Sequence, residues 1–181
     1  MSEMALVVSG HGEVEACPIL VRRISHELLG CFDLRVRRPI RKPESGLLKE
    51  DSDLLSRTLL RESRGAGAIL VLVDSEDGAP CTDGPRLQRR CDAACCHVPV
   101  TAVLAYREFE TWFLWDALNL FGRAPDFPPE RRRDAKDWIR RQRRLGYNPV
   151  ADSPGLAQLM DLERVAANSD SFGCSSTGSE P

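Results

Sequence analysis

Acidic side chains follow several of the apolar segments in this sequence, and they are the residues best suited to chemistry. Glu13 comes soon after the first such segment, Asp74 and Glu76 follow a later one, and Glu108 follows the segment after that. Carboxylate oxygens are the ligands that hard divalent cations such as Mg²⁺ or Mn²⁺ prefer in proteins. Bound ions of this kind can activate a water and stabilise the leaving oxygen of a phosphodiester. The acids are therefore candidates for a metal site, with Asp74, Glu76, Glu13 and Glu108 as the candidate ligands.

The spacing of these acids also leaves a purely structural explanation open. Asp74 and Glu76 could cap or flank the helix that follows them, and Glu108 could occupy the first turn of its own helix. Acidic side chains are favourable in both positions, because a helix N-terminus carries free N–H groups and a partial positive charge. The residue types alone do not separate a metal site from helix caps.

Strands and helices that would position the acids alternate over residues 1–106. Strands are expected over residues 5–9, 32–36, 68–73 and 98–105, and helices over 13–29, 54–62 and 83–96. The run 68–73 is apolar on both faces, which is typical of a central strand in a parallel sheet covered by helices. This order predicts an α/β fold with a mostly parallel sheet, and it places the acids at the carboxyl edge, where such folds bind ligands.

From Arg107 onward the pattern changes to helices only. Helices are expected over 107–121, 130–145 and 156–167, with the aromatic residues Trp112, Phe113 and Trp115 in the core or in an interface. We expect one domain over 1–167, formed by a core (1–106) and a helical extension (107–167). Residues 168–181 are polar and rich in Gly and Ser, and we expect a tail that is disordered beyond about Phe172.

Basic side chains cluster in the predicted helix 130–145, which makes it the candidate surface for nucleic acid. Phosphate binding needs cations on one face, and the candidate residues are Arg132, Arg133, Lys136, Arg140 and Arg144. The alternative is a solvated face whose arginines pair with the acids of the same helix. In the loop Gly10-His11-Gly12, His11 could donate a proton or contact phosphate at a helix N-terminus, or it could simply be solvated.

Composition excludes several classes of protein. The 181 residues are 42% hydrophobic with a formal net charge of −2, so no overall basic field indicates a nucleic-acid binder. The sequence shows no signal peptide and no apolar run long enough to span a membrane. Seven cysteines, an odd number, suit reduced thiols in the cytoplasm. The cluster from Cys91 to His97 lacks the ligand spacing of a zinc site, and Cys91 and Cys95 are expected to pack on the sheet from one helix face.

Several blocks of the sequence resemble a bacterial family of short Toprim-like proteins catalogued as domain of unknown function 4276. The blocks run in the family's order and cover nearly the whole chain. They are LVVSGHGEVEACPIL (6–20), VLVDSEDGAPC (71–81), LAYREFETWFL (104–114), KDW (136–138), and MDL (160–162) followed by NSDSF (168–172). The resemblance implies a Toprim-like, Rossmannoid core in which a glutamate after the first strand and an acidic pair after a later strand bind Mg²⁺.

Residue by residue, Asp74 and Glu76 match the acidic pair, and Glu13 and the Arg107-Glu108 step match the other blocks. The implied function is Mg²⁺-dependent action on phosphodiesters, as a nuclease component of a bacterial defence or DNA-maintenance system with an ATPase partner. That partner is an analogy with larger Toprim nucleases that are fused to ATPases.

One departure from the family pattern bears on catalysis. Ser9 stands where the family pattern places a glutamate, and a neutral hydroxyl is a poor substitute for a carboxylate base. Glu13 or Glu108 could take over part of that role. Alternatively, the chain is an inactive Toprim-like binding subunit that docks an ATPase or another partner. The substrate (DNA, RNA or a nucleotide) and the oligomeric state stay open.

Overall fold

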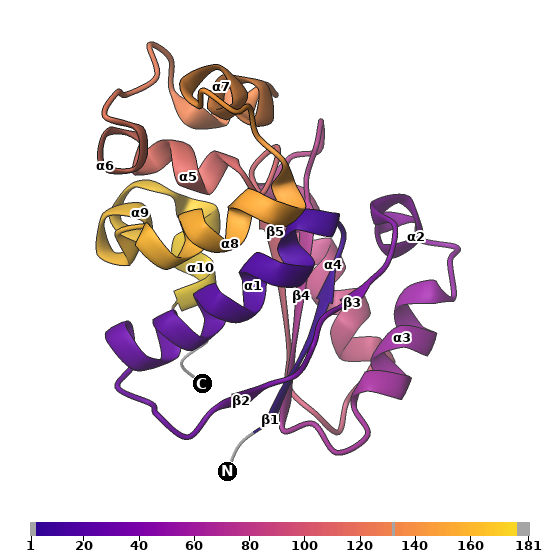
Figure 1. The fold of residues 1–181 in the computed structure, drawn as a ribbon. Helices are drawn as coiled ribbons and strands as arrows, with labels where there is room; N and C mark the ends of the chain where they lie inside the picture. Colours follow the sequence, from indigo (N-terminus) through magenta and orange to yellow (C-terminus); the bar gives the residue numbers. More distant parts are fainter. Residues whose placement is uncertain (1–2, 132, 177–181) are drawn as a thin grey trace.

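The computed structural model describes residues 3–131 and 133–176, and it places a parallel sheet between layers of helices (Figure 1). The central order is β2-β1-β4-β5, with β3 pairing β1 beyond the end of β2. Each of the strand pairs is parallel. The predicted α/β class with a mostly parallel sheet is confirmed. The strands are β1 (Glu3–Val8), β2 (Arg35–Val36), β3 (Ile40–Arg41), β4 (Ala68–Asp74) and β5 (Val100–Ala105).

Alternate residues of the central strands belong to two separate apolar clusters, one on each face of the sheet. Ala5 and Val7 of β1 belong to one cluster, whereas Leu6 and Val8 belong to the other. Successive side chains of a strand point to opposite faces, so a strand that is apolar throughout needs cover on both sides. Helices α2 (Glu44–Leu48), α3 (Leu54–Glu62) and α4 (Pro80–Ala94) supply the cover on the first face.

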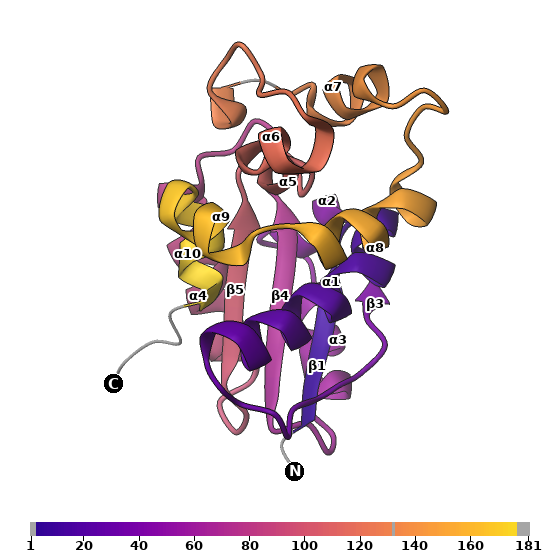
Figure 2. The ribbon, with the colours of Figure 1, turned by 60° about the vertical axis from the view of Figure 1, so that its left-hand side comes forward.

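The second face is covered by α1 and by helices from the C-terminal part of the chain (Figure 2). Short helices extend this layer past the carboxyl edge of the sheet, at the top of Figures 1 and 2. The elements of this layer are α1 (His11–Arg23) with the π-helical turn η1 (Ile24–Leu28), α5 (Thr111–Trp115), α6 (Ala117–Phe121), the 3₁₀ turn η2 (Pro129–Arg131), α7 (Ala135–Gln142), α8 (Pro149–Leu159), α9 (Leu162–Asn168) and α10 (Asp170–Ser176).

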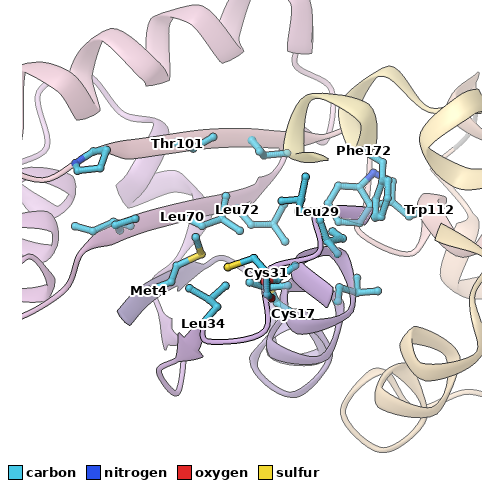
Figure 3. Close-up of a pocket in the computed structure, with 18 residues that line it drawn as sticks. Met4, Cys17, Leu29, Cys31, Leu34, Leu70, Leu72, Thr101, Trp112 and Phe172 are labelled. Carbon is cyan, nitrogen blue, oxygen red and sulfur yellow. The ribbon is translucent and has the colours of Figure 1, made fainter. Parts of the chain in front are cut away.

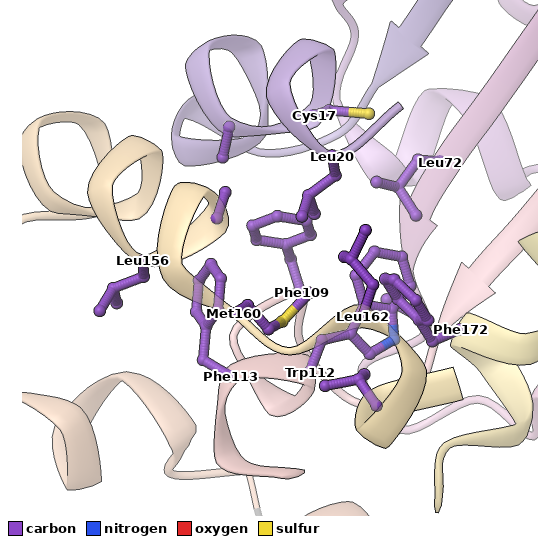
Figure 4. Packing of buried hydrophobic residues seen from close by; sticks show 14 of the residues in the cluster. Cys17, Leu20, Leu72, Phe109, Trp112, Phe113, Leu156, Met160, Leu162 and Phe172 are labelled. Atoms are coloured by element: carbon purple, nitrogen blue, oxygen red, sulfur yellow. The ribbon is translucent and has the colours of Figure 1, made fainter. Parts of the chain in front are cut away.

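Aromatic rings fill the centre of this second cluster (Figure 4). The Phe109 ring packs edge-on against Trp112 and Phe113, with centroids 5.2 and 5.4 Å away. Trp112 packs in the same way against Phe172, with centroids 5.0 Å apart. Edge-to-face pairs are the favoured geometry of aromatic rings. The predicted core position of Trp112 and Phe113 is confirmed.

Element boundaries in the N-terminal half lie within three residues of the prediction except at one place. The strand expected over 32–36 is limited to Arg35–Val36, and β3 and α2 follow it where no element was expected. Pro39 separates the two short strands, since proline has no N–H for a ladder hydrogen bond. By contrast, α3 spans the predicted residues, and Ser52 Oγ accepts the Leu54 N–H at its start (3.2 Å).

The predicted long helices of the C-terminal half are wrong in their extent. Residues 107–121 form α5 and α6, which are separated at Asp116, and residues 156–167 belong to α8 and α9. The carboxylate of Asp116 is buried and accepts the N–H of Asp161 (2.8 Å), which ties the α5–α6 break to the start of α9. Asp161 in turn caps α9 by accepting the Arg164 N–H (3.0 Å). Residues 130–145 contain η2 and α7 in place of one helix, so the expected arginine-rich helix is much shorter.

Residues 168–181 were expected to form a tail, but the described part of this segment, up to residue 176, contributes to the core. Asp170–Ser176 form α10, and Phe172 is fully buried. Ser171 Oγ accepts the Trp112 indole N–H (3.0 Å). Phe172 and Ser171 both contact Trp112 and so hold this segment in the core. The polar composition of the segment did not indicate these contacts. The rest of the predicted disorder, over 177–181, lies outside the described residues.

A cavity of about 310 Å³ lies between the amino-terminal half of the sheet and the α1–η1 layer (Figure 3). Met4, Leu70 and Thr101 line it from the strands, and Leu29 and Cys31 line it from the segment after η1. Its surface is mostly apolar. In the described part of the chain, no helix is long and apolar enough to cross a membrane.

Candidate functional site

Glu13 is held at the start of α1 by the loop Gly10-His11-Gly12. Its carboxylate turns back and accepts the backbone N–H groups of Gly10 (2.8 Å) and Ser9 (3.1 Å). A Cβ on Gly10 would collide with this carboxylate. A Cβ on Gly12 would lie 3.0 Å from the Cβ of Pro149 in α8. The two glycines therefore serve the placement of Glu13 and the close approach of α1 to α8.

Ser9 connects Glu13 to Asp74 at the end of the neighbouring strand. Its hydroxyl donates to Glu13 Oε2 (3.4 Å) and accepts the Asp74 N–H (3.1 Å). Asp74 Oδ1 accepts the Phe109 N–H (2.8 Å), which fixes the start of the segment after β5. The strands β1 and β4 are adjacent and parallel, so both acids lie at the same edge of the sheet.

The segment after β5 brings two more acids to this edge, and both face Lys136 of α7. Lys136 Nζ lies 3.4 Å from Glu110 Oε2 and 3.9 Å from Glu108 Oε2. Glu108 Oε2 also accepts the Lys136 backbone N–H (3.4 Å). The side chain of Glu110 is 2% exposed and that of Lys136 is 39% exposed, so the lysine connects a buried acid to the surface. We refer to Glu13, Asp74, Glu108, Glu110 and Lys136 as the acid–lysine site.

Buried hydroxyl groups fix the second oxygen of Glu110. The Tyr147 hydroxyl donates to Glu110 Oε1 (3.2 Å) and lies 2.7 Å from Ser153 Oγ of α8. Burial raises the pKa of Tyr147, and the charge of Glu110 adds to this effect. The phenol therefore stays protonated and can continue to donate. Glu110 Oε2 is buried without a hydrogen-bond donor, and Lys136 is its nearby counter-charge.

The site contains more negative than positive groups. Four carboxylates and one ammonium would carry a net charge of −3 if all were ionised, which is costly in a buried location. Burial raises the pKa of Glu13 to about 7, and the Gly10 N–H opposes this effect while the charge of Glu110 adds to it. Burial also raises the pKa of Asp74 well above its usual range, followed by repulsion from Glu13.

Glu108 and Lys136 respond to the same surplus of negative charge. Burial raises the pKa of Glu108, and the Lys136 ammonium opposes this effect. For Lys136, burial alone would lower the pKa, but the charges of Glu110, Glu108 and Asp74 outweigh it and raise the pKa. The Lys136 ammonium is therefore held in its charged form, whereas Glu108 binds a proton more readily than an ordinary carboxylate does.

Glu76, a predicted metal ligand, is turned away from the acid–lysine site. It has a positive φ of 47°, and its carboxylate binds the Arg133 guanidinium. Arg133 also binds Asp77 (2.6 Å), and Arg107, at φ 66°, donates to the Glu76 carbonyl (3.0 Å). A left-handed conformation is uncommon for both residue types and is found mostly where a turn is fixed by its surroundings. The expected pair of Asp74 and Glu76 therefore does not converge in this structure.

The arrangement of the predicted nucleic-acid residues also differs from the expectation. Lys136 belongs to the acid–lysine site, Arg133 precedes α7 and binds acids, and Arg140 of α7 pairs with Asp137. Arg144 lies exposed beyond the end of α7, and Arg132 is outside the described residues. The described residues of 130–145 thus do not form a single cationic face. The sequence alone did not indicate that α7 begins only at Ala135. Just before that start, Arg133 contacts Glu76 and Asp77 in the loop after β4.

His11 is exposed at the first position of α1. Among the described residues, no hydrogen bond or ion pair joins it to the acids. Glu110, Tyr147 and Ser153 are the residues that sequence reasoning did not assign to the site. The spacing of Glu108 and Glu110 was a signal for the first of them, whereas the other two depend on the docking of α8 onto α1.

The donor chemistry of the acid–lysine site fits Mg²⁺ or Mn²⁺. The oxygens of Glu13, Asp74 and Glu110 are of the type these ions take, and Glu110 Oε2 is buried without a donor. A divalent cation would also offset most of the surplus negative charge. In the arrangement seen here, the described residues contain no group of three or more His, Cys, Asp or Glu side chains positioned to hold a metal ion. Lys136 supplies positive charge to Glu108 and Glu110.

Comparison of the chain with protein-family models, with curated proteins and with solved structures finds no match. What the site can do therefore follows from its own residues: buried carboxylates at the carboxyl edge of a parallel sheet, neutralised in part by one lysine that reaches the surface.

Proposed function

We propose that this protein binds a divalent cation at the acid–lysine site and acts on phosphodiester bonds, as a Toprim-like nuclease. The observation that carries this proposal is the surplus of buried carboxylates over the single ammonium of Lys136. Buried charge without compensation is unfavourable, and sites that bind ions or react are where such imbalance is found. The resemblance to short Toprim-like proteins supports the same function.

Glu13, Asp74 and Glu110 would hold the cation, which would activate a water and offset charge on the phosphate oxygens. Lys136 is partly exposed and carries a fixed positive charge, so its role is to bind a phosphate oxygen at the mouth of the site. Glu108 keeps some contact with solvent and has a raised pKa, which makes it a better proton acceptor than an ordinary carboxylate. Ser9 and Tyr147 position Glu13 and Glu110.

Titration calorimetry with Mg²⁺ and Mn²⁺ tests this proposal without assuming a substrate. We expect the unmodified protein to bind and Asp74→Asn to lose binding, because the amide is a weaker ligand but can still accept the Phe109 N–H. Glu76→Gln is the matched control and should keep binding, since Glu76 pairs with Arg133. Absence of binding in the unmodified protein contradicts the proposal. Cleavage of DNA or RNA that depends on the metal and on Asp74 then tests the reaction.

A second candidate function, a non-catalytic binding subunit, is favoured by Ser9. Its hydroxyl bridges Glu13 and Asp74 as a structural link and offers no carboxylate for proton transfer. Ser9→Glu separates the two candidates. If the protein binds metal but cleaves nothing, and Ser9→Glu gains cleavage, the second candidate holds. Metal-dependent cleavage by the unmodified protein excludes it.

A further inference from the structure

The outer edge of the sheet carries a concentrated run of positive charge. Five of the eight residues from 35 to 42 are basic, and they form β2, β3 and their connection along β1 (Figure 1). In the order of the described strands, this segment is at the end of the sheet and pairs only with β1. We refer to Arg35, Arg37, Arg38, Arg41 and Lys42 as the basic edge.

Only part of this charge is used within the fold. Arg37 is structural, because it binds Glu3 (2.9 Å) and donates to the carbonyls of Glu62 and Arg64 (both 3.1 Å). Arg35 and Arg38 are 71% and 85% exposed, and they make long ion pairs of 3.9 Å with Glu3 and 3.7 Å with Glu15. Exposed pairs of this length contribute little, so these guanidinium groups can exchange partners at low cost.

The charge on the basic edge is not balanced by its acidic partners. Glu3 and Glu15 are the acids that its arginines pair with, and the charge of Glu62 also acts on Arg37, so five positive charges minus three negative charges leave an excess of two. Arg22 of α1 adds to it, because it lines a hollow of about 420 Å³ together with Arg37 and Arg38. In a chain with a net charge of −2, this is a local cationic surface and not part of a general field.

The basic edge leads to the acid–lysine site. Val8 pairs with Arg41, and the Lys42 N–H donates to the Val8 carbonyl (2.9 Å). Arg41 also donates to the carbonyl of Ser9 (3.0 Å), the residue that bridges Glu13 and Asp74. From Arg35 to Arg41 the segment extends roughly 20 Å at the usual rise of a strand, which is long enough to follow several phosphates of one nucleic-acid strand.

We propose that the basic edge binds the phosphate backbone of a single nucleic-acid strand and directs it to the acid–lysine site. The inference rests on the proposed function and deepens it by naming a polymeric nucleic acid as the substrate. A row of arginines that changes partners easily suits a repeating anion that is contacted without sequence preference. Its position at one side of the site allows the strand to continue beyond the reacting bond.

Fluorescence anisotropy with a labelled 20-nucleotide single strand tests the proposal, in EDTA so that the metal site does not contribute. The paired substitution Arg35→Gln/Arg38→Gln should weaken binding at least tenfold at low salt. It should also reduce the slope of log affinity against log salt by about 1.4, since each phosphate contact on a single strand contributes about 0.7. The matched control is Arg140→Gln/Arg141→Gln on α7, which removes two exposed charges and should leave both quantities nearly unchanged.

The outcomes separate this inference from the function on which it rests. Asp74→Asn should bind the strand like the unmodified protein in EDTA, so a failed metal titration and a failed strand titration are distinct results. Equal weakening by both arginine pairs, weakening by the α7 pair alone, or no strand binding at low salt overturns the inference. Binding of anionic vesicles or of a poly-glutamate peptide in place of the strand also overturns it.

Discussion

Two regions on the same face of the sheet are packed in different ways. At the carboxyl edge, four buried or half-buried acids and a lysine each contact specific partners. The Ser9 hydroxyl, for example, joins Glu13 to Asp74. At the opposite half, the α1–η1 layer leaves an apolar cavity of about 310 Å³ (Figure 3). Buried polar groups need individual hydrogen-bond partners, whereas apolar burial is non-directional and sets no specific partner. Side-chain positions are therefore fixed by individual contacts at the charged end of the sheet, and the apolar end leaves space between its side chains.

We expect the largest change in the free energy of unfolding when the one ammonium group of the acid–lysine site is removed. Lys136→Met leaves Glu108 and Glu110 without their counter-charge and should lower the free energy of unfolding by about 3 kcal/mol at pH 8. At pH 5 the loss should be smaller, because burial raises the pKa of Glu108 and this acid takes up a proton more readily as the pH falls. Urea denaturation at both pH values measures this, with Arg140→Met on the same helix as the control. An equal loss at both pH values would contradict the electrostatic explanation.

The pH dependence of Glu13 gives the next largest effect. Its pKa is raised from 4.5 to about 7 in the folded state, so the folded protein binds the proton more tightly than the unfolded chain. The resulting stabilisation is complete below pH 4.5 and is lost as the pH rises through 7. Between pH 5 and pH 8, the free energy of unfolding should fall by roughly 2 kcal/mol more in the unmodified protein than in Glu13→Gln. Parallel curves for the two proteins would show that Glu13 titrates normally.

The smallest effect is expected at the cavity. Thr101→Ile adds apolar volume where Thr101 faces the cavity and should raise the free energy of unfolding by about 0.5 to 1 kcal/mol. The same substitution at Thr111 in α5, which is fully buried, should lower it by about 1 to 3 kcal/mol through overpacking. Thermal denaturation of both variants makes the comparison. Destabilisation by both would mean that the apolar end is packed as tightly as the rest.

Sequence reasoning recovered the sheet better than the helical extension. The apolar runs of β1, β4 and β5 and the helix α3 are local patterns, and each was predicted close to its observed place. The division of 107–121 depends on Asp116, whose buried carboxylate is held by the distant Asp161. No pattern within a short window contains that contact, so the periodicity suggested one continuous helix.

The candidate site was predicted in part for a similar reason. Glu13, Asp74 and Glu108 follow strands that the sheet places side by side, so topology alone brings them together. Glu76 is only two residues from Asp74, yet the turn at positive φ and the pairing with Arg133 direct it elsewhere. Lys136 was expected on a nucleic-acid surface, and the contacts of α7 place it among the acids.

The docking of α10 has a consequence for the order of events during synthesis. Phe172 packs against Trp112, and Ser171 accepts the Trp112 indole N–H, so a central part of the core needs residues that are translated about 60 positions later. Until those residues leave the ribosome, the Trp112 face of the nascent chain stays open and its N–H has no protein acceptor. Folding of this face is thus coupled to translation of α10, although the strands that form the sheet have all been made long before.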